Sequence, residues 1–209
     1  MNTEKLTQKT IEALRGAQNA ATENGNPSVE EEHLLYALLT QPDGLVGEVM
    51  RSVGASPEDM IAELDRLIAQ FPKAGGSGYA PSRIYISASL DKALTEAEKQ
   101  AGKMKDDYIS VEHVLLGILE YPTDNVKALF RAQNVTAAAV LEALRKIRGN
   151  QKVTSDNPED TYNVLKKYGT DLVARARERK LDPVIGRDEE IRHVIRILSR
   201  KTKNNPCLI

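Results

Sequence analysis

Cysteine, tryptophan, histidine and aromatic residues in general are scarce in this chain of 209 residues. The one cysteine, Cys207, excludes an intramolecular disulfide framework. Three histidines, spread along the chain, are too few and too scattered for a zinc site. Aromatic residues make up 4% of the sequence, and β-sandwiches or barrels normally need more. No apolar run approaches the ~18 residues of a membrane span, and the polar N-terminus is not a signal peptide, so the cytoplasm is the expected compartment.

The residues that are abundant favour a globular helical protein. Hydrophobic residues make up 41% and charged residues 28% of the chain, and good helix formers dominate. The net charge of −1 is divided unevenly, because residues 1–148 carry −5 and residues 149–209 carry +4. An acidic first part argues against nucleic-acid binding, and a tail of +4 is weak support for a polyanion partner.

An internal repeat organises the first part of the chain. Shifting the sequence against itself by 80 residues gives a match without gaps. The identical pairs include Ala13/Ala93, Leu14/Leu94, Ala17/Ala97, Ala21/Ala101, Glu32/Glu112, His33/His113, Leu35/Leu115, Leu39/Leu119 and Pro42/Pro122. Hydrophobic class also matches at positions that are not identical, such as Ile61 and Leu141. We therefore expect two copies of one structural unit, repeat one over 1–71 and repeat two over 82–148.

Each repeat has the apolar spacing of four helices. The fold expected for residues 1–148 is all-α, with the two four-helix repeats packed pseudo-symmetrically because neither alone offers a large core. Loop residues rich in Gly and Pro separate the repeats at 72–81, and polar residues at 149–159 predict an interdomain linker.

Residues 160–209 predict a separate, mainly helical segment. Helices are expected near 161–168 and near 172–179. A third is expected to start near Arg187 or Asp188 and to carry Ile191, Val194, Ile195 and Leu198. Cys207 begins an apolar run that is expected to be a buried strand, with no nucleophilic role for its thiol. We expect the chain to be a piece of a longer protein, truncated within this second module.

Three segments of the tail resemble the start of the first AAA+ module of Clp ATPases, which is an α/β domain. They are 168–172 (YGTDL), 180–191 (KLDPVIGRDEEI) and 203–206 (KNNP). Residues 1–148 resemble the double Clp repeat of the same family. Three further segments resemble the ClpB-type disaggregases within it, namely 107–113 (DYISVEH), 148–154 (RGNQKVT) and 157–162 (NPEDTY).

The resemblance implies an ATP-driven hexameric chaperone that threads aggregated polypeptides through a central pore and works with the DnaK system. This chain would supply its substrate-binding N-terminal region and would be a monomer without catalytic residues, because the Walker A loop of the family lies beyond Ile209. The alternative is an adaptor-binding region of a ClpA- or ClpC-type unfoldase that feeds a protease. The cofactor implied for the longer protein is ATP with Mg.

The resemblance also implies site residues. Thr7, Asp106 and Glu112 match positions thought to handle substrate, although each also suits a helix cap or a first helical turn, and the adjacent Asp107 could take the place of Asp106. Val184, Ile185 and Gly186 match the segment that contacts adenine in the longer protein. The apolar groove of the family is not expected here in its usual form, because more polar residues occupy its positions: Glu96, Gln100 and His113.

His33 and His113 leave two interpretations open. A metal or acid–base role would use both histidines beside Glu32 and Glu112, whereas a structural role would pack each against the loop before its helix. The structural role is favoured because no further ligands accompany them. The basic residues from Arg175 to Lys180 are expected to be a solvated helix face.

Overall fold

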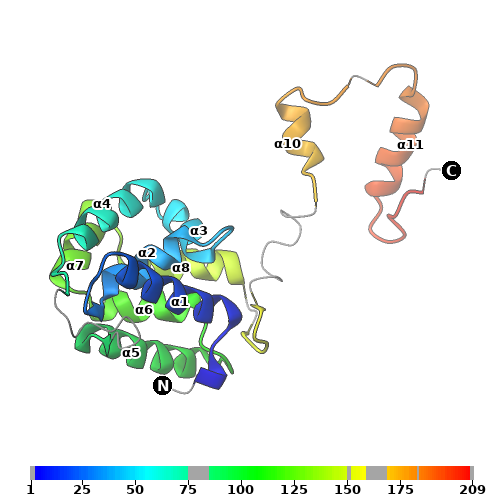
Figure 1. Ribbon diagram of the computed structural model, residues 1–209. Coiled ribbons are helices and arrows are strands. Elements are labelled where there is room, and N and C mark those ends of the chain that lie inside the picture. The colour runs from blue at the N-terminus through cyan, green and yellow to red at the C-terminus, as the bar shows by residue number, and fades with distance from the viewer. Residues whose placement is uncertain (1–2, 75–84, 150–151, 159–168, 183, 208–209) are drawn as a thin grey trace. The chain divides into compact units, whose positions relative to one another are not determined.

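The computed structural model describes residues 3–74, 85–149, 152–158, 169–182 and 184–207 (Figure 1). The chain divides into two compact units, Met1–Asn163 and Val164–Ile209.

In its described residues, the first unit has two sets of four helices, preceded by a 3-10 turn at Thr3–Lys5. The first set comprises α1 (Gln8–Glu23), α2 (Glu31–Thr40), α3 (Leu45–Ser52) and α4 (Pro57–Ala69). The second set comprises α5 (Ala88–Met104), α6 (Val111–Glu120), α7 (Asp124–Ala132) and α8 (Ala137–Arg148). Corresponding helices begin 79 or 80 residues apart. The all-α fold with a duplicated four-helix unit is therefore confirmed.

Local capping explains why the repeats begin their helices at the same register. Thr7 caps α1 and Ser87 caps α5, each with its hydroxyl accepting a backbone N–H three residues later. Ser56 and Thr136 cap α4 and α8 in the same way. Each cap satisfies one of the backbone donors that a helix N-terminus leaves unpaired.

Two short parallel pairings, which the sequence pattern did not reveal, join the repeats crosswise. Strand β1 (Ser28–Val29) of the first repeat pairs with β2 (Tyr85–Ile86), which leads into α5. Leu6, which leads toward α1, pairs with Ile109 of the second repeat. The approach to the first helix of each repeat is thus fixed by the other repeat.

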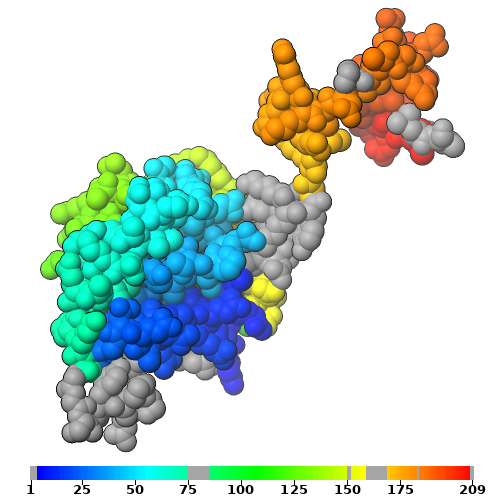
Figure 2. All heavy atoms as spheres, turned by 45° about the horizontal axis from the view of Figure 1, so that its top comes forward, coloured from blue at the N-terminus to red at the C-terminus, as the bar shows by residue number. Residues whose placement is uncertain are grey.

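Part of the predicted linker lies against the first unit. The side chain of Val153 is fully buried and Pro158 is also buried. The backbone carbonyl of Asp156 accepts the Gln8 N–H at 2.8 Å. In Figure 2, residues 152–158 (yellow) lie beside the first residues of α1 (blue). The segment predicted as a linker over 149–159 therefore includes residues that this unit holds.

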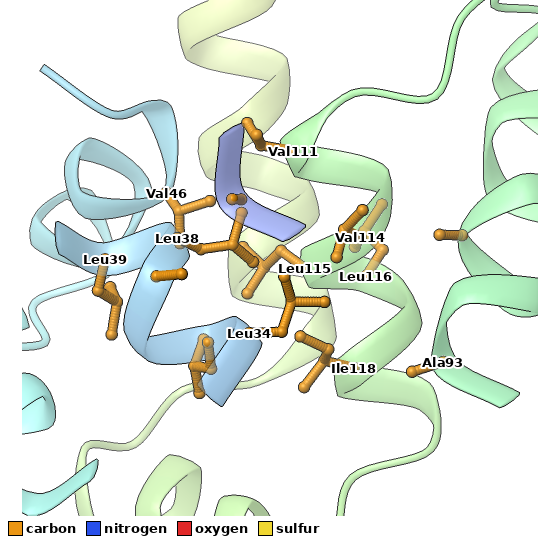
Figure 3. Packing of buried hydrophobic residues seen from close by; sticks show 14 of the residues in the cluster. Leu34, Leu38, Leu39, Val46, Ala93, Val111, Val114, Leu115, Leu116 and Ile118 are labelled. Atoms are coloured by element: carbon orange, nitrogen blue, oxygen red, sulfur yellow. The ribbon is translucent and has the colours of Figure 1, made fainter. Parts of the chain in front are cut away.

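One continuous hydrophobic core spans both repeats. Leu34 and Leu38 of α2 and Leu115 and Ile118 of α6 have essentially no exposed surface. Figure 3 shows these side chains meeting where α2 and α6 approach each other. Because the core is shared, each repeat buries its apolar face against the other, as the size of a single repeat predicts.

The second unit contains α10 (Leu172–Arg177) and α11 (Asp188–Leu198). Apolar residues on these helices are exposed, among them Leu172, Ile195 and Leu198. Cys207 is exposed as well, so the expectation that it starts a buried strand is wrong for the described residues. The helix predicted near 161–168 lies outside the described residues. Among the described helices, none has the length and apolar character needed to cross a membrane.

Candidate functional site

The three residues predicted to handle substrate have buried side chains near the start of α1 and α6. Thr7 and Glu112 have at most 1% of their surface exposed, and the carboxylate-bearing side chain of Asp106 has none. Direct contact with a polypeptide therefore requires an opening beside them. Their role in substrate handling stays a prediction, and their contacts define what it involves.

Thr7 joins the two repeats at the start of α1. Its backbone N–H donates to the Ile109 carbonyl at 3.0 Å, and its hydroxyl lies 2.9 Å from the Thr10 hydroxyl. The Thr10 hydroxyl in turn donates to the Ile109 carbonyl at 3.2 Å. Thr7 is consequently both the cap of α1 and a contact to the loop before α6.

Asp106 is the centre of a buried polar cluster. One carboxylate oxygen accepts the Val153 N–H at 2.9 Å and a hydrogen bond from the Arg148 guanidinium. The other lies 3.0 Å from Nε2 of His113. Because His113 Nδ1 accepts the Ser110 N–H at 3.0 Å, the ring proton is on Nε2 and is donated to Asp106.

The electrostatics of the cluster keep Asp106 ionised and His113 neutral. Burial alone would raise the pKa of Asp106, but hydrogen bonds from Arg148 and Val153, together with the charge of Arg148, outweigh it and hold that pKa below its usual value. Burial lowers the pKa of His113, despite the nearby carboxylates of Glu112 and Asp106. At neutral pH the cluster is an Asp–Arg ion pair that holds a neutral imidazole.

The equivalent place in the first repeat lacks the charges. His33 Nδ1 accepts the Glu30 N–H at 3.0 Å, and its Nε2 lies 3.1 Å from the side-chain oxygen of Asn26. Burial lowers the pKa of His33 to about 4. Both histidines thus complete a capping box at the start of a helix, which confirms their structural role. Within the described ranges, no group of three or more His, Cys, Asp and Glu side chains is placed to hold a metal ion.

A pocket of about 360 Å³ opens beside this cluster. Its lining combines apolar residues, one buried acid and three basic residues from α5, α6, α8 and the residues that follow α8: Met104, Glu112, Leu141, Leu144, Arg145, Arg148, Gly149 and Lys152. Leu141 and Met104 are half-buried, whereas Arg145 and Lys152 are exposed at the rim. Sequence reasoning identified Glu112 but not the α8 residues, because nothing in their spacing distinguishes a pocket wall from an ordinary helix face.

Glu112 brings unsatisfied acceptors to this pocket. Neither of its carboxylate oxygens has a hydrogen-bond partner among the described residues. Arg148 Nη1 lies 3.6 Å from one of them, which is an ion-pair distance but too long for a good hydrogen bond. A buried carboxylate without donors is costly, so a ligand that offers an N–H group here gains more than it would at the surface.

Polar side chains occupy the positions at which the family resemblance led us to expect an apolar groove. Glu96 is buried on α5 and forms ion pairs with Lys99 at 3.1 Å and Lys103 at 3.3 Å. Gln100 donates to the same carboxylate at 3.0 Å. These charges and hydrogen bonds make the outer face of α5 a poor surface for an apolar chain.

A second pair of buried acids, Glu31 and Glu32, lies between the repeats, and of the two only Glu32 was named from the sequence. Glu31 accepts the Thr123 N–H at 2.9 Å, and Glu32 accepts the Thr123 hydroxyl at 2.9 Å and the Asn125 amide at 3.2 Å. Burial raises the pKa of Glu31 to about 7. The hydrogen bond from Thr123 lowers this pKa, whereas the nearby charges of Glu32 and Glu30 raise it further. The N-terminus of α7 is therefore held by two acids from α2.

Replacing Glu31 with glutamine is expected to stabilise the fold at alkaline pH. The raised pKa means that the folded state holds the Glu31 proton more tightly than the unfolded chain. This contribution to stability is complete below about pH 4.5 and is lost as the pH rises toward about 7. Glu31→Gln, which removes the charge but keeps an acceptor for Thr123, should raise the unfolding free energy by up to about 3 kcal/mol at pH 8 and change it little at pH 4.5. Urea unfolding at both pH values measures this, and an equal effect at the two values would contradict it.

The predicted adenine-contacting residues lie in the second unit. The side chains of Val184 and Ile185 are 68% and 87% exposed, and Gly186 has a φ of +75° that favours glycine. These residues lie in the irregular segment before α11, and their apolar side chains are exposed. Their contact with the adenine of ATP stays a prediction.

Similarity to known proteins agrees with this architecture. Residues 5–133 match the Clp repeat (R) N-terminal domain family. The whole chain aligns with chaperone protein ClpB of Nitratidesulfovibrio vulgaris at 47% identity and with that of Bacillus anthracis at 46%. The alignment covers 24% of the length of each relative, so the chain spans about a quarter of the curated proteins that it matches.

A solved structure shows the same fold. The N-terminal domain of Hsp104 from Candida albicans superposes with a TM-score of 0.64 at 21% identity, covering 74% of this chain and 99% of that chain. The relatives favour the ClpB-type interpretation over the ClpA or ClpC alternative. Family match, repeat and helix order thus agree that the chain belongs to the Clp repeat N-terminal domain family and resembles ClpB chaperones along its full length.

Proposed function

We propose that this chain engages unfolded or aggregated polypeptides as the N-terminal region of a ClpB-type disaggregase. The observation that carries the proposal is the pocket beside Glu112, which combines an apolar floor, a buried acid and a basic rim. The longer protein would be a hexameric ATPase that threads these polypeptides and cooperates with the DnaK system, whereas this chain alone would be a monomer in the cytoplasm.

The pocket suits one part of an extended polypeptide. An apolar side chain would cover Met104 and Leu141, and a backbone N–H would donate to the unpaired oxygens of Glu112. Arg145 and Lys152 at the rim would attract acidic residues that flank the apolar one. Because every polypeptide has N–H groups and many have an apolar residue beside an acid, this chemistry is selective for exposed chains without requiring one sequence.

Substituting the pocket floor should weaken peptide binding. Leu141→Gln is expected to raise the Kd for a fluorescent unfolded peptide, apolar and acidic, by about tenfold, since one lost apolar contact is worth ~1.4 kcal/mol. Ile61→Gln is the matched control, because Ile61 occupies the equivalent half-buried place in the first repeat. Equal affinities of the two variants, measured by fluorescence anisotropy, would disprove the pocket as the binding surface.

ATP with Mg is proposed as the cofactor of the longer protein. When bound, ATP supplies the free energy of hydrolysis for threading. In this chain, Val184 and Ile185 would contact the adenine and Gly186 would allow the tight turn between them and α11. The 209-residue chain is expected to hydrolyse no ATP, because the phosphate-binding loop supplies much of the affinity and all of the phosphate positioning. Turnover by the purified chain would contradict this.

A further inference from the structure

The segment 152–158 is held against the N-terminal domain at both ends. Val153 and Pro158 are buried, while the residues between them are exposed. The segment is therefore anchored by one buried residue at each end and is exposed to solvent between them. A free interdomain linker would show neither anchor, because its residues would be exposed throughout.

Hydrogen bonds fix the segment near both anchors. The Val153 N–H donates to Asp106, and its carbonyl accepts the Asp107 N–H at 3.0 Å. Farther along, the backbone and side chain of Gln8 both donate to Asp156, at 2.8 Å to its carbonyl and 3.0 Å to its carboxylate. The segment therefore bridges the start of α1 and the loop before α6.

All three residues predicted to handle substrate lie near the place where the segment 152–158 is held. Asp106 accepts directly from the segment, and Thr7 positions the first turn of α1 from which Gln8 donates. Glu112 faces Arg148, whose guanidinium donates to Asp106 from the end of α8. The burial of Thr7 and Asp106, neither of which lines the pocket, suits a role in holding the segment.

We propose that the Asp106–Arg148 pair fastens residues 152–158 to the N-terminal domain and so withholds them from the connection to the following module. Asp106 and Arg148 are positioning residues in this role. Loss of the pair would release residues 152–158, which span at most about 23–25 Å when extended. A longer connection changes the effective concentration of a domain near its neighbours, so the pair would tune how the domain delivers polypeptides. The fastening itself does not depend on the proposed function.

The first repeat supplies a well-tolerated test variant. Asn26 stands where the second repeat has Asp106, and it pairs with His33 in the same manner. Asp106→Asn should therefore keep the contact to His113 and the fold. It should lose both the ion pair with Arg148 and the bond from the Val153 N–H, because the amide NH2 would replace the oxygen that accepts them. Asp107→Asn is the matched control, because it makes the same chemical change at the neighbouring, exposed residue.

Hydrogen exchange of the 209-residue chain tests the proposal directly. We expect the Val153 amide to exchange at least tenfold faster in Asp106→Asn than in the unchanged chain or in Asp107→Asn, while the Leu115 amide in the core keeps its protection. Trypsin cleavage after Lys152 should accelerate in parallel. Val153→Ser provides a second variant that leaves the polar cluster intact and should release the segment by removing its apolar anchor.

Three results would overturn the proposal: a Val153 amide that is unprotected in the unchanged chain, protection that survives Asp106→Asn, or an equal increase in Asp107→Asn. If Asp106→Asn lowers the protection of Leu115 as well, Val153→Ser decides, and unchanged cleavage after Lys152 in that variant counts against the fastening. Peptide affinity is a separate readout, so failure of the pocket to bind peptide leaves this test unaffected.

Discussion

Replacing Gly117 with alanine is expected to lower the unfolding free energy by about 3 kcal/mol or more, and replacing it with valine is expected to prevent folding. A Cβ at this place in α6 would lie 2.1 Å from the Ala93 carbonyl oxygen and 3.0 Å from the Ala97 nitrogen of α5. Both atoms belong to the backbone, so the clash can be relieved only if the two helices separate. Separation would open the core around Leu115 and lose the close packing of the second repeat.

Thermal and urea unfolding measure the effect, and Gly102 provides the control. Gly117→Ala should lower the Tm by about 6–12 °C, from the usual relation for a chain of this size. Gly102 lies on α5 with no atom within 4 Å of an added Cβ. Gly102→Ala should therefore raise stability by about 0.5–1 kcal/mol through helix propensity. If Gly117→Ala matched that gain, the close approach of α5 and α6 would be incorrect.

The surroundings of Gly117 show that the helices could be predicted from the sequence but their close crossing could not. The 80-residue repeat predicts the eight helices because apolar spacing and caps are local properties. In that alignment, Gly117 corresponds to Ala37, and Gly16 corresponds to Glu96. A Cβ on Gly16 would lie 3.2 Å from the Ala37 Cβ, so each repeat places a glycine at its helix crossing, but on opposite helices. Only tertiary packing shows this exchange.

The site shows the same division between local and distant information. The capping roles of Thr7 and the histidines follow from residues three positions away, and they are predictable. The contacts of Asp106 join residues more than 40 positions apart, namely Arg148 and Val153. The composition of residues 149–159 indicates a linker because polar residues dominate, and one valine in a polar stretch gives no sign that it is buried. Buried Glu31 is hidden similarly, since an acid in a first helical turn is ordinary.

Replacing Arg148 with methionine is expected to cost about 3–5 kcal/mol, the second large effect. The Arg148 side chain is 10% exposed. Its guanidinium faces the fully buried carboxylate of Asp106 and lies 3.6 Å from a carboxylate oxygen of Glu112. Methionine keeps the length and apolar stem of the side chain but leaves the carboxylates without a positive charge. Arg145→Met on the exposed face of α8 is the control and should change stability by no more than about 0.5 kcal/mol.

The stability that Arg148→Met loses should become smaller as the pH falls. This pH dependence distinguishes the loss of a charge from a packing defect. In the unchanged chain the pKa of Asp106 is lowered, so ionised Asp106 contributes fully to folding stability at pH 7. This contribution is lost only as the pH falls through the lowered pKa. Without Arg148, burial would raise the pKa of Asp106, so this carboxylate would take up a proton at a higher pH and the variant would recover stability as the pH falls. A packing defect alone would give a difference that does not depend on pH.

A double-mutant cycle with Asp106→Asn measures whether Asp106 and Arg148 stabilise the fold as a pair. The first repeat has Asn26 and Ile68 where the second has Asp106 and Arg148, so an uncharged pair already occurs at the equivalent place in the same fold. Asp106→Asn combined with Arg148→Met should therefore cost less than the sum of the single changes, by about 1–3 kcal/mol. Glu112 remains unpaired in the double variant and limits the recovery. Additive losses in urea unfolding would show that Asp106 and Arg148 act independently.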